Sequence, residues 1–147
     1  MRAHELSLAL WDTRALSAWH GGAGRESSIY VQPLDPLGRL EGAPIRVSDG
    51  PDAAFEPDLV AGESGMAIAW YQRARRSGDL SAWLAGLLPG GERQWIVPLT
   101  AGGEQARNPV VRFIDETLHV AWIEQGRSSE EGAAIWYQRF SSAGEAL

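Results

Sequence analysis

The sequence predicts an all-β protein made of small antiparallel sheets that repeat along the chain, and three observations support this. The 147 residues include 17 Gly and 8 Pro, which indicates many turns and short strands. The hydrophobic fraction of 44% is that of a globular chain, and seven Trp are available for packing. The third and strongest observation is an internal repeat, which gives every element its place.

Two independent sets of aromatic markers define the repeat. Ala-Trp pairs occur at Ala18-Trp19, Ala69-Trp70 and Ala121-Trp122, so their Trp residues are 51 and 52 positions apart. Further along each repeat come Ile29-Tyr30, Ala82-Trp83 and Ile135-Trp136, with an aromatic spacing of 53 in both intervals. Agreement between two marker sets predicts three copies of one structural unit.

Each repeat divides into short strands joined by turns. The clearest strand alternates, with Leu118, Val120 and Trp122 on one face. His119, Ala121 and Ile123 occupy the other face, which is also mostly apolar. Four short strands per repeat, apolar on both faces, are typical of a β-propeller blade, because each blade packs between two neighbours. The small Ala beside each Trp lets an adjacent sheet approach.

The repeat places three four-stranded antiparallel blades in a single unit, 1–147, which is part or half of a β-propeller. The blades cover about 5–49, 57–100 and 108–147, and the last lacks its outer strand. Three blades do not close a ring, so the two outer faces require neighbours. Either missing blades of a longer chain or a second copy of this chain, in a homo-oligomer, provides them. We expect the uncovered apolar side chains to be Leu8, Trp19 and Tyr30 on one side, and Trp122 and Trp136 on the other.

The repeat also resembles a known class. The order Ala-Trp, Ile29-Tyr30-Val31-Gln32, the turn Leu34-Asp35-Pro36-Leu37-Gly38 and a strand ending Val47-Ser48 or Leu99-Thr100 resembles propeller-forming repeats of bacterial secreted and surface proteins. These repeats are distantly similar in form to sialidase-like BNR propellers. The resemblance implies a secreted or cell-surface location, although no signal peptide is evident in the sequence. The sialidase Asp-box, Ser-x-Asp-x-Gly-x-x-Trp, is absent, which weakens a catalytic sialidase interpretation.

Composition argues against several kinds of partner. The net charge is −6, and nucleic-acid binding requires a basic surface. There is no Cys, and His4, His20 and His119 lack ligand spacing, so we expect no metal and no cofactor. No apolar stretch is long enough for membrane insertion. A Gly-x-Ser-x-Gly nucleophile motif is also missing, so the sequence assigns no catalytic residue.

The polar cluster Arg73-Ala74-Arg75-Arg76 is the first candidate for binding. It lies in the loop between the second and third strands of the middle repeat, and Arg25 falls in the equivalent loop of the first. Arg107 and Asn108 are expected in a connection between blades at the same end. Such arginines suit carboxylate or sulfate groups, although a solvated loop paired with nearby carboxylates is the simpler interpretation.

Two functional hypotheses follow. The first is a non-catalytic binding or interaction module for a protein, a glycan or another anionic ligand. The second is a fragment of a sialidase-like glycoside hydrolase, whose chemistry requires two carboxylates about 5 to 10 Å apart. Asp52, Glu56 and Glu104 lie in suitable connections for this second role.

Overall fold

The computed structural model describes residues 3–22, 26–101, 105–126 and 132–147. Arg25 and Glu104 lie outside the described residues. No helix among the described residues is long and apolar enough to cross a membrane. The regular elements in this part of the chain are the eleven strands β1 (Ala3–Trp11), β2 (Arg14–Gly21), β3 (Ser28–Leu34), β4 (Ile45–Arg46), β5 (Ala53–Gly62), β6 (Gly65–Arg73), β7 (Leu80–Leu87), β8 (Arg93–Pro98), β9 (Gln105–Ile114), β10 (Thr117–Gln125) and β11 (Ala133–Phe140).

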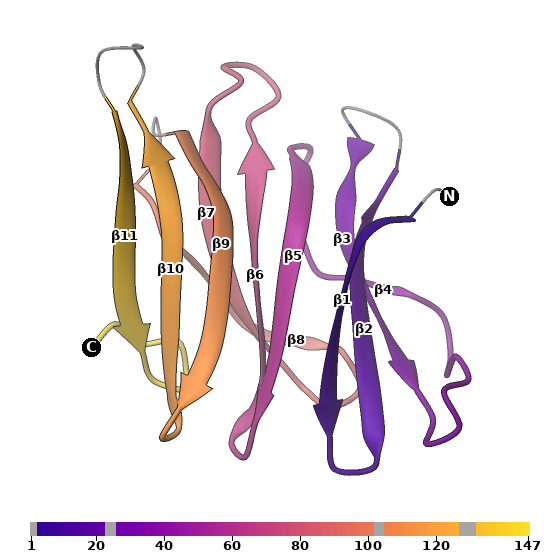
Figure 1. Ribbon diagram of the computed structural model, residues 1–147. Coiled ribbons are helices and arrows are strands. Elements are labelled where there is room, and N and C mark those ends of the chain that lie inside the picture. The colour runs from indigo at the N-terminus through magenta and orange to yellow at the C-terminus, as the bar shows by residue number, and fades with distance from the viewer. Residues whose placement is uncertain (1–2, 23–25, 102–104, 127–131) are drawn as a thin grey trace.

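The strands form three consecutive antiparallel blades, and the predicted fold class is confirmed. Blade 1 contains β1 to β4, blade 2 contains β5 to β8, and blade 3 contains β9 to β11. A single parallel bridge between Leu80 and Gln105 connects the sheets of blades 2 and 3. The blades stand side by side in chain order (Figure 1).

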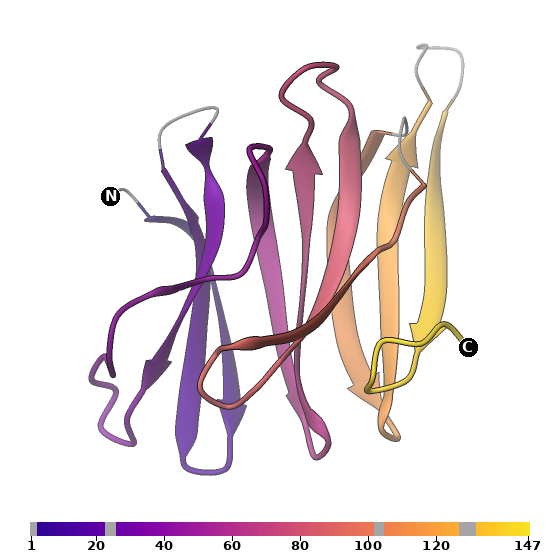
Figure 2. The same ribbon diagram turned by 180° about the vertical axis from the view of Figure 1, so that it is seen from behind.

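The first strand of each blade lies on a common edge. β1, β5 and β9 contact one another in sequence along the side that faces the viewer in Figure 1. β4 and β8 lie on the opposite side, which faces the viewer in Figure 2. Because the innermost strands of propeller blades surround the ring axis, we call the side of β1, β5 and β9 the inner edge.

The two sets of aromatic markers are cross-strand partners in every blade. Trp19 lies opposite Tyr30, Trp70 opposite Trp83, and Trp122 opposite Trp136. Directly opposed residues project from the same face of a sheet. Each blade therefore has a Trp face, which carries its aromatic pair, and an Ala face, which carries Ala18, Ala69 or Ala121.

The core consists of two apolar layers, one between each pair of blades. The first layer joins Leu16, Ala18 and Val31 of blade 1 to residues of blade 2 that include Ile68 and Trp70. In the second layer, the Ala face of blade 2 meets the Trp face of blade 3. The Ala face of one blade thus always receives the Trp face of the next.

This order corrects one expectation. Trp122 is only 4% exposed and packs against blade 2, instead of lying on an outer face. The uncovered side of blade 3 is its Ala face, with Val110, Ile135 and Tyr137 exposed. Face alternation along β10 was predicted from the sequence, but the direction in which successive blades stack was not.

Candidate functional site

A residue with positive φ interrupts the first strand of every blade at the same position. Glu5 in β1, Glu56 in β5 and Asn108 in β9 have φ of 51°, 53° and 52°. Each coincides with a shift of strand register, which is the mark of a β-bulge. A bulge leaves one residue unpaired and redirects its side chain. We call Glu5, Glu56 and Asn108 the bulge residues.

The backbone conformation of the bulge residues is unfavourable for Glu in particular. Asn tolerates the left-handed region better than most residues, whereas Glu has no such advantage. Strained residues of this kind persist where their surroundings fix them, and they concentrate at functional sites. A residue with positive φ occurs at this position in all three blades, on the inner edge. The bulges are therefore a candidate functional site.

The bulge residues of blades 2 and 3 are in direct contact. Asn108 donates from Nδ2 to Glu56 Oε2 over 2.6 Å, and the Tyr71 hydroxyl donates to Glu56 Oε1 over 3.3 Å. The three bulges line an open cavity of about 350 Å³, whose wall also includes Pro57, Pro109 and neighbouring residues. Carboxylate and amide groups from three blades therefore converge at one end of the inner edge.

His20 connects the first bulge to the second. The backbone N–H of Glu56 donates to His20 Nδ1 over 3.4 Å, and Glu5 Oε2 lies 3.6 Å from the same nitrogen. Because Nδ1 accepts this hydrogen bond, it is unprotonated in this arrangement. Burial, and secondarily the charge of His4, lowers the pKa of His20, against an opposing effect of Glu56. We call Glu5, His20, Glu56, Tyr71 and Asn108 the axial cluster.

A row of rings accompanies the axial cluster across blades 1 and 2. His4 stacks on His20, the edge of His20 meets Phe55, and Phe55 stacks on Tyr71, with 5.4 Å between ring centroids in each case. The guanidinium carbon of Arg73 lies 5.8 Å from the Phe55 ring centre, which is cation–π distance. The His4–His20 contact lies within blade 1 and the Phe55–Tyr71 contact within blade 2, and the His20–Phe55 contact joins the two blades.

The environment of Tyr71 changes its acidity. Burial, followed by the charge and hydrogen bond of Glu56, raises the pKa of Tyr71 to about 12. A tyrosine hydroxyl is protonated at neutral pH with or without this shift, and the raised pKa keeps Tyr71 a donor to Glu56 in basic solution as well. The cluster therefore offers two donors, Tyr71 and Asn108, and two carboxylates.

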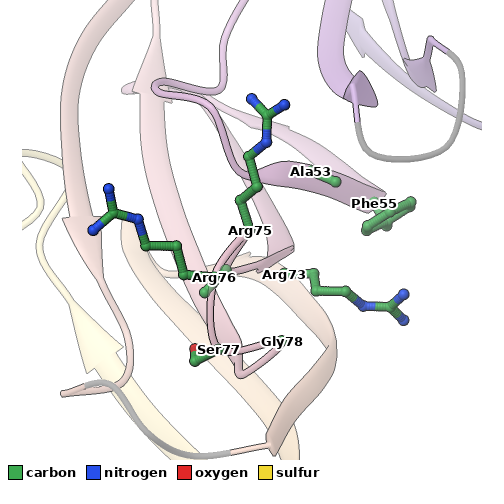
Figure 3. A pocket seen from close by; sticks show the side chains of 8 residues that line it. Ala53, Phe55, Arg73, Arg75, Arg76, Ser77 and Gly78 are labelled. Carbon is green, nitrogen blue, oxygen red and sulfur yellow. The ribbon is translucent and has the colours of Figure 1, made fainter.

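The arginine loop of blade 2 forms a separate hollow at the same end of the blades. Arg73, Arg75 and Arg76 line a cavity of about 480 Å³ together with Ala53, Phe55, Ser77 and Gly78. Figure 3 shows the three arginine side chains pointing in three different directions from the loop. The backbone N–H of Arg75 is held by Asp52 Oδ1 at 2.9 Å. In this arrangement the three guanidinium groups do not converge on one small anion.

The other two predicted binding residues lie within a strand. Arg107 and Asn108, expected in a connection between blades, belong to β9. Arg107 is half-buried, and its Nε is buried without a hydrogen-bond partner among the described residues. Their role in binding stays a prediction.

Glu56 and Asn108 were among the residues predicted from the sequence, whereas Glu5, His20 and Tyr71 were not. A signal was present, since the bulge residues follow the repeat, 51 and 52 positions apart. The bulge residues are Glu in two blades and Asn in the third, however. A repeat recognised by its aromatic and small residues therefore did not reveal them. No group of His, Cys, Asp or Glu within the described ranges has the arrangement of a metal site.

Comparisons with known proteins support the architecture. No protein-family model matches the chain, and no curated protein matches it either. An endo-arabinase from Bacteroides thetaiotaomicron has a similar structure, with a TM-score of 0.56 and 16% identity over 90% of this chain and 55% of that chain. A subtype N11 neuraminidase-like protein of A/flat-faced bat/Peru/033/2010 (H18N11) has a TM-score of 0.55 and 9% identity, covering 100% of this chain and 52% of that chain.

The chain therefore spans about half the length of the solved structures it matches. Both are β-propeller proteins with glycoside hydrolase-like folds. At these identities the likeness shows the fold alone. Three β-propeller blades, stacked in chain order, are the architecture on which the axial cluster is built.

Proposed function

We propose that the three blades belong to a β-propeller that binds a glycan at the axial cluster without turnover. One observation supports this above all: equivalent bulges bring polar side chains of three blades to one end of the inner edge. Ligand sites generally combine a concave surface with a few fixed polar groups, and the bulge cavity with its adjoining rings has both.

The chemistry of the cluster suits sugar hydroxyls. Glu5 and Glu56 are acceptors for hydroxyl donors, and hydrogen bonds to a charged acceptor are stronger than neutral ones. Asn108 retains a second amide hydrogen beyond the one given to Glu56. The Phe55 and Tyr71 rings add apolar surface beside these groups.

Charge favours a neutral glycan over a strongly anionic one at this position. Two carboxylates lie in the cluster, and the nearest cation in the row of rings is Arg73, above Phe55. Arg75 and Arg76 project from the loop in other directions (Figure 3). A protein ligand or an anionic group would have to use the arginine loop instead.

A specific observation favours glycoside hydrolysis as the second candidate. Glu5 and Glu56 come from adjacent innermost strands and both contact Nδ1 of His20, Glu5 through its carboxylate and Glu56 through its backbone N–H, and such hydrolysis uses a pair of carboxylates. An endo-arabinase and a neuraminidase-like protein are among the similar structures. In that case this chain contributes part of an active site, and further blades complete it.

Glycan-array binding, followed by titration calorimetry on any hit, tests the proposal. We expect Glu56→Gln, which keeps the shape but removes the charge, to weaken binding by about tenfold or more, as for hydrogen bonds to charged groups. Arg75→Ala/Arg76→Ala, which leaves the cluster intact, should change affinity less than about twofold. Loss of binding in the arginine variant alone would contradict the proposal and favour the loop.

A hydrolysis assay gives the second candidate its positive test, and the glycan array tests the first. Under our proposal the parent chain releases no fluorophore from arabinoside or sialoside reporters. If the parent releases the fluorophore and Glu56→Gln does not, hydrolysis would take the place of binding without turnover as the function of the cluster.

A further inference from the structure

Both junctions inside the chain have the same construction. The Ala face of blade 1 meets the Trp face of blade 2, and the Ala face of blade 2 meets the Trp face of blade 3. In each case a Trp that is at most 4% exposed, Trp70 or Trp122, belongs to the later blade. In both junctions, therefore, the Ala face belongs to the earlier blade and the Trp face to the later one.

A hydrogen bond between first strands also repeats at these junctions. The N–H of Leu59 donates to Ser7 Oγ over 3.0 Å, and the N–H of Val111 donates to Asp58 Oδ2 over 2.8 Å. Ser7 and Asp58 occupy equivalent positions, directly after the bulge. The earlier blade always supplies the acceptor, and the later blade always supplies the backbone donor.

The two uncovered faces are the missing halves of this same junction. Leu8 on the Trp face of blade 1 is 55% exposed, whereas its equivalent in the middle blade, Leu59, is 5% exposed. Tyr137 on the Ala face of blade 3 is 58% exposed, whereas its equivalent, Leu84, is fully buried. Leu10 and Ile135 are exposed on the same two faces. The middle blade shows how such positions look when a neighbour covers them.

We propose that two copies of this chain associate head to tail, so that the Ala face of blade 3 in each copy covers the Trp face of blade 1 in the other. A directional contact repeated around a two-fold axis closes into a ring, here of six blades. The chain spans 55% and 52% of the two similar propeller proteins, so two copies supply about one full length. This inference rests on the sheet faces and is independent of any ligand.

Ring closure also extends the axial cluster. In each internal junction, the bulge residue of one blade lies beside that of the next, as Asn108 and Glu56 show. Closure places Glu5 of the second copy in the corresponding position next to Asn108. The partner copy therefore contributes a carboxylate to an otherwise incomplete ring of bulge residues.

Light scattering on the full chain is the first test. We expect a species of twice the 16.0 kDa chain mass at micromolar concentration. Ala121→Arg, at the centre of the open Ala face, should weaken association by about tenfold or more, since a buried unpaired charge is costly. Ser64→Arg is the matched control, because Ser64 lies in an exposed turn of the middle blade, and it should leave the mass unchanged.

A second variant keeps the test valid if Ala121→Arg does not fold. Val110 occupies the position of Ser7 and Asp58 but offers no acceptor to Leu8 of the other copy. Val110→Asp supplies it, so the dissociation constant should decrease by about three- to tenfold, as for one added hydrogen bond. An unchanged or weaker association in a folded Val110→Asp variant would overturn the proposed register.

Cross-linking fixes the geometry. The chain has no Cys, so Leu8→Cys/Val110→Cys introduces the only thiols, and oxidation should give a two-chain band on a non-reducing gel. Each single variant should remain one chain, because its thiols are far apart in the ring. A folded parent of single-chain mass, or a mass that increases without limit with concentration, would overturn the proposal. Glu56→Gln should retain the two-chain mass whatever its effect on glycan binding.

Discussion

At the scale of single residues, Glu56 forms hydrogen bonds with residues of all three blades. Its backbone N–H contacts His20 of blade 1, while its carboxylate accepts hydrogen bonds from Tyr71 of its own blade and Asn108 of blade 3. These contacts hold a Glu in a backbone region that costs about 1–3 kcal/mol. Equivalent backbone geometry at Glu5 and Asn108 shows that the bulge itself belongs to the blade, and that side-chain chemistry varies on it.

His20 should make stability depend on pH. Burial lowers its pKa in the folded protein, so between that value and the ordinary 6.5 the unfolded chain binds more protons. The contribution of His20 to the free energy of unfolding is therefore complete above pH 6.5. It decreases as the pH falls from 6.5 through the lowered pKa of the folded protein. We expect a lower urea midpoint at pH 5.5 than at pH 7.5, and a smaller decrease in His20→Gln.

The control for this prediction removes another histidine. His119 lies on the Ala face of blade 3 beside Tyr137, away from the axial cluster, so the comparison is made in Ala121→Arg, in which that face stays uncovered. His119→Gln should keep the decrease in midpoint seen in the parent. An equal decrease in His20→Gln and the parent would show that His20 does not contribute to the pH dependence.

At the scale of elements, the turn after the third strand contacts the preceding blade in blades 2 and 3. Gly38, Gly91 and Gly144 occupy equivalent turns with φ of 75°, 94° and 84°. Gly144 lies against the ring of Trp95 in β8, and Trp95 Nε1 donates to the carbonyl of Ser142 over 3.1 Å. The turn thus adds a contact between blades 2 and 3 outside the apolar layer.

A pair of glycine substitutions measures this contact. Both Gly144→Ala and Gly38→Ala place a side chain at positive φ, which costs about 1–2 kcal/mol. At Gly144 the added Cβ would also lie 2.6 Å from Trp95 Cε3, whereas Gly38 has nothing within 4 Å. We therefore expect Gly144→Ala to lower the free energy of unfolding by about 1–3 kcal/mol more than Gly38→Ala. Equal losses in chemical denaturation would show that the turn of blade 3 adjusts without cost.

Most of the strand order could be predicted from the sequence, but the axial cluster could not. Trp70 and Trp83 mark paired strands because alternation and spacing are properties of the chain itself. The contact of His20 with Phe55 depends instead on how one blade stacks on the next. The burial of Trp122 was missed for the same reason, since alternation defines two faces without saying which one meets the preceding blade.

At the scale of the whole molecule, the middle blade holds the structure together. Its Trp face packs in the layer with blade 1, and its Ala face packs in the layer with blade 3. The outer blades each have one covered face. Damage to either layer should therefore destabilise two blades at once, and the layer around Trp70 offers the clearest measurement.

Trp70→Ala should lower the free energy of unfolding by about 3–5 kcal/mol, as for other buried aromatic residues. The Trp70 ring is fully buried in the first layer, and its Nε1 donates to Gln72 Oε1 over 3.0 Å. Removing the ring leaves a cavity between blades 1 and 2 and deprives Gln72 of that donor. Trp136→Ala is the matched control, because Trp136 is 50% exposed and its loss should cost only about 1–2 kcal/mol. Urea midpoints followed by circular dichroism compare the two variants, and equal losses would mean that the layer between blades 1 and 2 does not determine the stability of the chain.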